Sequence, residues 1–161
     1  MLKGREIKGL AVFAGKNLEE IGRVQDMLVN NANGKVVALV IQSGGVINKS
    51  LYVDMQNVRQ INKTGVFVPN KNSFKRLPKK TQTLGQKGWV GSKLYGANGQ
   101  DKGTIADVLI KSGTITGFEI SGGLIGDLRK RRDFLPWQKV TSHGGSFYEE
   151  DFFKNCPKYL P

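Results

Sequence analysis

Short apolar runs separated by glycine-containing turns make up most of the chain. Runs of about four to eight residues between turn signals are typical of β-strands, whereas a helix needs a longer stretch with apolar residues at every third or fourth position. We therefore expect strands at residues 7–13, 22–29, 34–41 and 87–95, among others. Helix is expected to be scarce, with a short 3₁₀ turn at residues 55–58.

The same succession of strands occurs twice along the chain. Both copies carry a glycine, an aliphatic residue two positions later, an aspartate two positions after that, and then three apolar residues. The corresponding segments lie at offsets of 81, 79 and 82 residues: 22–29 with 103–110, 34–41 with 113–120, and 52–58 with 134–140. Because a solenoid repeat spans about 20–50 residues, this longer period indicates two complete small domains.

The two copies predict an all-β protein with two domains in tandem. We place the first domain at residues 1–74 and the second, with a C-terminal tail, at residues 85–161. The segment between them, residues 75–84, is basic, contains proline and is poor in aliphatic residues, which is typical of a linker.

A regular strand does not place all the apolar residues of the aspartate motif on one face. Val24 and Met27 lie an odd number of positions apart, as do their equivalents in the second copy, whereas side chains alternate between faces along a strand. A β-bulge next to Asp26 and Asp107 would restore the face by inserting one residue. Because the two aspartates occupy equivalent positions, we expect them to form hydrogen bonds near the bulge rather than to bind a ligand.

Alternation in the following strand predicts which side chains point inward. Val37, Leu39 and Ile41 share one face in the first copy, as their equivalents do in the second, and alternation puts Leu39 and Ile41, with Phe118 and Ile120, inward. The other face of the first copy's strand is apolar as well, with Val36 and Val40. We expect that face to meet the other barrel or another chain.

With these motifs, each copy resembles a PRC-barrel domain. The resemblance rests on Gly-x-Val/Ile-x-Asp-x-Leu, on Gly-x-Val/Ile-x-x-Leu/Phe-x-Ile, and on the apolar pair before Val58 or Val140. It implies two small six-stranded barrels in tandem with little helix. The related reaction-centre H subunit and the C-terminal domain of the ribosome maturation factor RimM imply docking on a protein or an assembly, without catalysis.

Candidate catalytic and metal-binding residues are few. The sequence has one cysteine, Cys156, and one histidine, His143, which precedes two glycines in an expected turn. A single thiol supports neither a disulfide nor a cysteine metal site, and nothing near the histidine orients a catalytic triad. We therefore expect a protein that is not an enzyme and that uses no metal or other cofactor.

Two basic clusters are the candidate partner-binding residues. Lysine and arginine total 25 against 13 acidic residues, a formal net charge of +12, which favours polyanionic partners. One cluster lies in the linker, and the other in the loop between the third and fourth strands of the second copy: Lys75, Arg76, Lys79 and Lys80, and Arg129, Lys130, Arg131 and Arg132. The loop either docks on phosphates, anionic headgroups or an acidic partner, or is solvated between Asp127 and Asp133.

The aromatic residues do not point to a nucleic-acid surface. Trp89, Phe118, Phe134 and Trp137 fall at positions expected in cores, so no exposed row for stacking bases is evident. A protein partner is favoured, and an RNA- or ribosome-associated factor and peripheral association with an anionic membrane are the alternatives. The N-terminus lacks a signal peptide's apolar stretch and no segment reaches the roughly 18 apolar residues of a membrane span, so a cytoplasmic location is expected.

Overall fold

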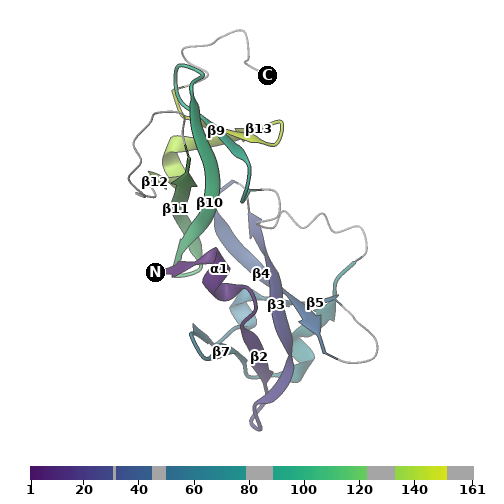
Figure 1. Cartoon of the computed structure of the whole chain (residues 1–161). Coiled ribbons are helices and arrows are strands. Elements are labelled where there is room, and N and C mark those ends of the chain that lie inside the picture. Colours follow the sequence, from purple (N-terminus) through teal and green to yellow (C-terminus); the bar gives the residue numbers. More distant parts are fainter. Residues whose placement is uncertain (31, 45–49, 79–88, 123–132, 152–161) are drawn as a thin grey trace.

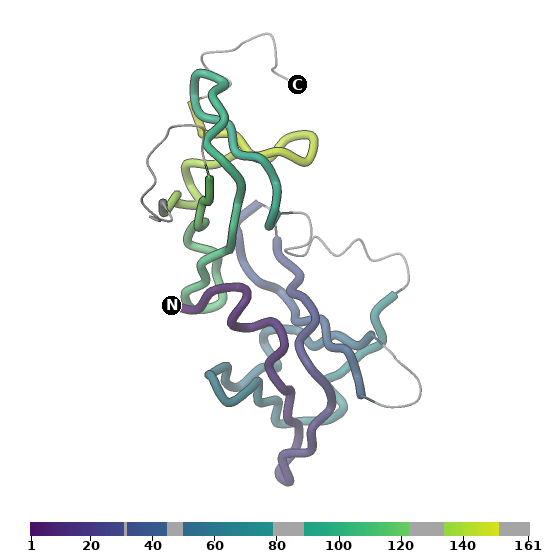
Figure 2. The backbone as a smooth tube through the Cα atoms, viewed as in Figure 1, coloured from purple at the N-terminus to yellow at the C-terminus, as the bar shows by residue number. Residues whose placement is uncertain are grey.

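The computed structural model of the chain describes residues 1–30, 32–44, 50–78, 89–122 and 133–151. The described residues are mostly β-structure, as predicted, and their one α-helix, α1 (Gly4–Ile7), is a single turn. Each copy contributes one half of an elongated molecule, and the two halves lie end to end (Figures 1 and 2).

Equivalent strands of the two copies occur in the same order in the sheet. In the first copy the sheet runs β6-β7-β2-β3-β4-β5, and in the second it runs β13-β14-β9-β10-β11-β12. The first set is β2 (Ala11–Ala14), β3 (Glu19–Asn30), β4 (Lys35–Ser43), β5 (Ser50–Asp54), β6 (Gln60–Asn62) and β7 (Gly65–Val68). The second set is β9 (Lys93–Tyr95), β10 (Asp101–Lys111), β11 (Thr114–Ser121), β12 (Asp133–Pro136), β13 (Val140–His143) and β14 (Ser146–Glu149). Six strands in each copy agree with the expected barrels, although among the described strands the sheet stays open.

Smaller elements complete each copy. The 3₁₀ turn predicted at residues 55–58 is present as η1 (Met55–Asn57). Its equivalent in the second copy is η4 (Trp137–Lys139). A second 3₁₀ helix, η2 (Lys71–Ser73), leads into β8 (Phe74–Arg76), which pairs with β5. The strand expected to open the first copy at residue 7 begins only at Ala11, because Ile7 ends α1 and is buried there.

The predicted bulge is present in both copies. The pairing of β3 with β4 steps from Val24 to Asp26, and the pairing of β10 with β11 steps from Ile105 to Asp107. In each bulge the aspartate carboxylate accepts a hydrogen bond from the next backbone N–H, at 2.9 Å for Asp26 and 2.8 Å for Asp107. The aspartates therefore have the structural role expected of them, since they satisfy an N–H where the ladder is disrupted.

A second irregularity near the end of each hairpin changes which residues face inward. The pairing steps from Leu28 opposite Ala38 to Val29 opposite Val36, so Val37 is the extra residue of the bulge. Val37 is consequently 43% exposed and Val36 only 2%. The prediction that Val37 shares a face with Leu39 and Ile41 was wrong, because strict alternation does not hold across a bulge.

The rest of the inward face is as predicted. Leu39, Ile41 and Phe118 are fully buried, and Ile120 is nearly so. On the other face of β4, Val40 is also buried within the chain, at 2% exposure. That face is therefore covered by the chain itself and is not a free apolar surface for a second chain.

The motif glycines allow the partner strand to approach closely. A Cβ on Gly22 would lie 2.1 Å from the carbonyl oxygen of Gln42, and one on Gly103 would lie 2.5 Å from that of Ser121. Gly103 also has φ +111°, a conformation that other residues avoid. Any side chain at either position must displace backbone of the neighbouring strand.

We expect Gly22→Ala to lower the free energy of unfolding by about 1–3 kcal/mol, because the added methyl group overpacks the β3–β4 ladder. Urea denaturation followed by far-ultraviolet circular dichroism measures the change. Gly44→Ala is the matched control, since a Cβ there meets nothing within 4 Å. Equal effects of the two substitutions would contradict this account of the motif glycine.

The hairpin ends of the two copies pair with each other reciprocally. The N–H of Val36 donates to the carbonyl of Gly113 and the N–H of Ile115 donates to that of Gly34, each at 2.8 Å. Thr114 is the register partner of Lys35, so β4 and β11 join the two sheets. The buried apolar side chains of both copies form one contiguous cluster across this junction.

The first residues of the chain belong structurally to the second copy. Strand β1 (Leu2–Lys3) pairs with β10, where Leu2 is opposite Ile110 and Lys3 opposite Leu109. The chain then passes through α1 into β2 of the first copy, and Figure 1 shows the N-terminus beside β10. A boundary drawn along the sequence therefore does not separate the two packed units.

An ion pair ties β9 to β10 at the far end of the second copy. The Lys93 ammonium donates to the Asp101 carboxylate at 2.6 Å, and the Gly103 N–H donates to the same group at 2.8 Å. These two hydrogen bonds, the Lys93 bond first, hold the pKa of Asp101 below its usual value of 3.8. Because the folded pKa is the lower one, the pair's stabilisation is present above about pH 4 and is lost as the pH falls through the folded pKa.

We expect Lys93→Met to raise the pKa of Asp101, because the substitution removes the larger of the two stabilising hydrogen bonds. A carboxyl-carbon nuclear magnetic resonance titration measures the midpoint directly. Lys75→Met, which removes another exposed lysine that is paired with an aspartate, should leave the Asp101 midpoint where it is. An unchanged midpoint in the Lys93 variant would show that the pair does not persist in solution.

Candidate functional site

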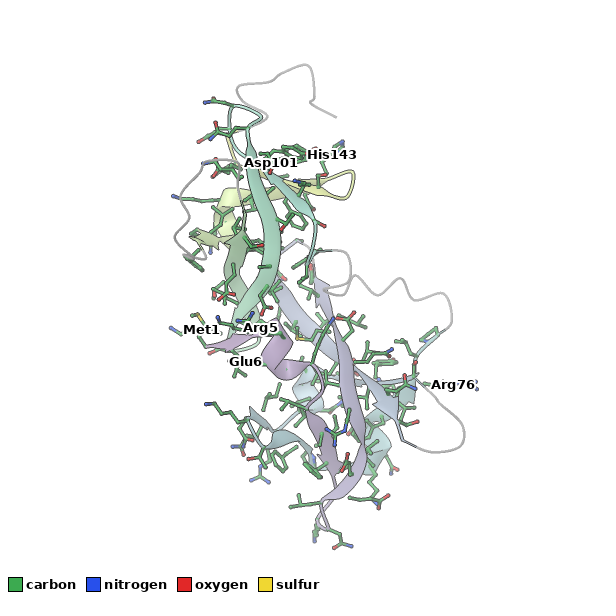
Figure 3. The ribbon with its side chains drawn as sticks, in the orientation of Figure 1. Met1, Arg5, Glu6, Arg76, Asp101 and His143 are labelled. Atoms are coloured by element: carbon green, nitrogen blue, oxygen red, sulfur yellow. The ribbon has the colours of Figure 1, made fainter. Side chains whose placement is uncertain are left out.

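The structure describes two of the basic residues predicted to bind a partner. Lys75 and Arg76, which the sequence placed at the start of a linker, lie in β8 instead. Arg76 is exposed and projects from the side of the first copy, far from the junction of the two halves (Figure 3). The remaining predicted residues lie outside the described part of the chain: Lys79, Lys80, Arg129, Lys130, Arg131 and Arg132.

Lys75 is already engaged within the first copy. Its ammonium donates to Asp54 at 2.9 Å and lies 5.7 Å from the centroid of the Tyr52 ring. The hydrogen bond with Asp54 is the main cause of the raised pKa of Lys75. Lys75 therefore helps to attach β8 to β5, whereas the neighbouring Arg76 is available to a partner.

Many basic side chains in the described ranges have no acidic side chain within 4.0 Å, although others are paired. We call these the unpaired cations: Lys16, Lys35, Arg59, Lys63, Arg76, Lys111 and Lys139. All seven are exposed, so they display positive charge on the surface of the described part of the chain.

Two buried carboxylates lie where the N-terminal segment crosses the second copy. Asp107 and Glu119 are register partners on β10 and β11, with side chains 2% and 10% exposed. Lys3 forms an ion pair with Glu119, and the Arg5 guanidinium lies 3.3 Å from Asp107 and 3.7 Å from Glu119. Figure 3 shows Arg5 at the junction between the halves. These contacts hold the first residues of the chain against the second copy.

The first copy has only part of this arrangement. Asp26 is equivalent to Asp107 and pairs with Lys8 at 3.6 Å, but Val40 stands where the second copy has Glu119. Buried charges are costly unless they are paired. The carboxylate pair is therefore explained by the two cations that cover it, and it is a structural site.

A cavity of about 570 Å³ opens at the junction, on the side of the first copy. Its inner wall is apolar and includes Ile7, Met27 and Leu39, each at most 2% exposed. Its mouth is formed by residues 58–63 before and along β6 and by the β10–β11 turn at residues 110–113. The sequence did not predict this cavity, because its lining residues come from both copies and are far apart along the chain.

The equivalent space in the second copy is filled by aromatic rings. Trp89, Phe118, Trp137 and Phe147 form a cluster with ring centroids 5.3–6.0 Å apart. At the equivalent positions the first copy has smaller residues: Ile7, Leu39, Met55 and Val66. Of the aromatic residues predicted to lie in cores, only Phe134 is wrongly placed, since it is 55% exposed.

The described residues hold no arrangement that indicates a metal site or a catalytic centre. Within those ranges no three His, Cys, Asp or Glu side chains gather closely enough to bind a metal ion. His143 ends β13 at a hairpin turn in which Gly144 and Gly145 both have positive φ, as predicted for a turn histidine. No helix in the described part of the chain is long and apolar enough to cross a membrane.

The chain therefore consists of two copies of one six-stranded unit, joined by reciprocal hairpin pairing. This architecture is that of a tandem protein of small β-barrel-like domains. The PRC-barrel domain family model matches residues 1–72 and 87–150. The chain therefore belongs to the PRC-barrel family and carries the domain twice, as the resemblance implied. Domains of this family are generally non-catalytic. A search of curated proteins found no match.

Proposed function

We propose that this chain is a non-enzymatic docking module that binds an acidic face of a protein or an assembly. The observation that carries the proposal is the set of unpaired cations, all of which are exposed. A positive surface of this kind steers an acidic partner and fixes its orientation. The basic loop predicted from the sequence, residues 129–132, carries four further positive charges that such a partner could bind.

The placement of the aromatic residues favours a protein over single-stranded nucleic acid. Trp89 and Phe147 are buried in the second copy, and Tyr95 stacks on Tyr148 with ring centroids 5.5 Å apart. Binding of single strands depends largely on exposed rings that stack on bases. In the described residues the exposed aromatic side chain is Phe134, which is too little for such a surface.

Affinity capture from the cells that make the protein tests the proposal. The tagged full chain is used as bait, with parallel samples treated with ribonuclease or with detergent. We expect a defined protein to be retained in both treated samples and to be released as salt is raised. Loss of every captured protein on ribonuclease treatment would favour the RNA-associated alternative, and loss in detergent would favour membrane association.

Two variants with the same loss of charge show which cations matter. The first replaces Arg129, Lys130, Arg131 and Arg132 with alanine, and the second replaces four cations that are already paired, Arg23, Lys71, Lys93 and Lys102. We expect the first variant to lose the partner and the second to retain it. Equal retention by both would remove the basic loop from the proposed surface.

A further inference from the structure

We propose that the cavity at the junction binds a small amphipathic anion, a single unbranched acyl chain with a carboxylate head. The site goes beyond the docking function proposed above: it shares Arg59, Lys63 and Lys111 with the unpaired cations, but it is defined by an apolar cavity behind them. We name it the junction cavity; it is lined by residues of β1, α1, β3, β4, η1, β6 and the β10–β11 turn.

The size of the junction cavity fits such a ligand. Its volume of about 570 Å³ lies within the range of about 300–1,000 Å³ that is usual for small-molecule sites. Its floor consists of flexible or aliphatic side chains: Met55 is half-buried there, and Met27 and Leu39 lie fully buried behind it. Methionine adapts its shape to an irregular apolar ligand, so this floor suits an alkyl chain better than a rigid polar molecule.

The mouth of the junction cavity carries positive charge alone. Arg59, Lys63 and Lys111 all line it, all are exposed, and all belong to the unpaired cations. The described lining residues include no aspartate or glutamate. An apolar interior with a cationic entrance is complementary to a molecule that has an apolar body and one anionic end.

Comparison of the two copies shows that the space is specific to the first. Trp137 of the second copy packs on Gly34, at 3.1 Å from the position of a Cβ, whereas the equivalent Met55 reaches the equivalent Gly113 only at 3.9 Å. The same fold therefore accommodates a large ring at this position in one copy and leaves the space unfilled in the other. The apolar body of a ligand would cover in the first copy the side chains that Trp137 covers in the second.

The methionines give a direct readout of binding. The chain has three methionines, and Met1, Met27 and Met55 all line the junction cavity. In the full chain labelled with ¹³C at the methionine methyl groups, we expect decanoate below its micelle concentration to shift the Met27 and Met55 signals saturably. Decanol, which has no charge, should bind more weakly, and decylamine should bind least, because its cationic head is repelled by the mouth.

Matched variants distinguish the effect of the cations at the mouth from the effect of positive charge elsewhere on the surface. Replacing Arg59, Lys63 and Lys111 with glutamine should weaken decanoate binding by about tenfold or more and leave decanol binding unchanged, because a charged head group loses its charged hydrogen-bond donors. The control replaces Lys16, Arg76 and Lys139 with glutamine. These are unpaired cations that do not line the cavity, so decanoate should bind as in the natural chain.

Filling the cavity tests its interior. Met55→Trp copies the residue at the equivalent position of the second copy and should abolish the decanoate-induced shift of Met27. If this variant does not fold, the glutamine variants still test the proposal. The proposal is overturned by any of three results: no shift of Met27 and Met55 with decanoate, equal affinity for decylamine, or equal loss of affinity in the two glutamine triples.

Discussion

Replacing Phe118 with alanine is expected to lower the free energy of unfolding by about 3–5 kcal/mol. Phe118 is fully buried, and its ring contacts those of Trp89, Trp137 and Phe147 at centroid distances of 5.6–6.0 Å. The substitution removes the centre of the aromatic cluster, and the surrounding rings are too rigid to close the space. Guanidinium denaturation followed by far-ultraviolet circular dichroism measures the loss.

Phe134→Ala is the control for this prediction, because it removes the same side chain from the same copy. Phe134 is 55% exposed, so its replacement should cost less than about 1 kcal/mol. Tryptophan fluorescence provides a second measurement, since both tryptophans of the chain, Trp89 and Trp137, lie in the cluster. A similar loss of stability in the two variants would mean that the second copy does not depend on the aromatic cluster.

Replacing both Lys3 and Arg5 with alanine is expected to destabilise the protein by about 2–4 kcal/mol. The change leaves Asp107 and Glu119 buried without their cations. The cost falls below that of a fully buried pair, because the Lys3 and Arg5 side chains are themselves 33% and 49% exposed and are partly screened by water. We expect the N-terminal segment to detach from β10 as a result. Hydrogen exchange at Leu109 and Ile110, which are register partners of β1, measures that detachment.

Arg23→Ala is the matched control, since Arg23 pairs with Glu20 between side chains that are 64% and 48% exposed. Such a pair contributes less than about 1 kcal/mol. A second variant converts both carboxylates to the corresponding amides, Asp107→Asn and Glu119→Gln. In that background the loss of Lys3 and Arg5 should cost much less than in the natural chain. If the cost is unchanged, the cations stabilise the junction by packing and not by charge.

The junction of the two copies connects these results to function. Reciprocal hairpin pairing, the crossing of the N-terminal segment and a shared apolar cluster join the halves into one body. Halves that are joined in this way hold their surface groups close to one arrangement, which favours docking on a partner to the extent that little ordering is needed on binding. The same junction creates the cavity, so a ligand bound there would also stabilise the contact between the copies.

The sequence alone determined the features that depend on neighbours along the chain. The repeat, the six strands of each copy and the bulges at Asp26 and Asp107 are such features. They follow from the alternation of apolar and polar residues along each strand and from the break in that alternation beside the aspartate. The mismatch between Val24 and Met27 is a local signal, and it predicted the bulge correctly. The second bulge gave no such signal, because Val36, Val37 and Ala38 are all apolar and either register would satisfy the pattern. Val37 was for that reason placed on the wrong face.

Only the tertiary structure shows how the two copies contact each other. Nothing in the residues around Leu2 and Lys3 shows that they pair with a strand more than a hundred positions away, because that pairing depends on the relative placement of the two units. The junction cavity is likewise invisible in the sequence, since it results from smaller side chains at positions whose neighbours become known only after folding. Local patterns along the sequence determine the strands and most of their inward faces. Contacts between distant segments depend on how the two whole units pack, and this packing determined where the cavity forms.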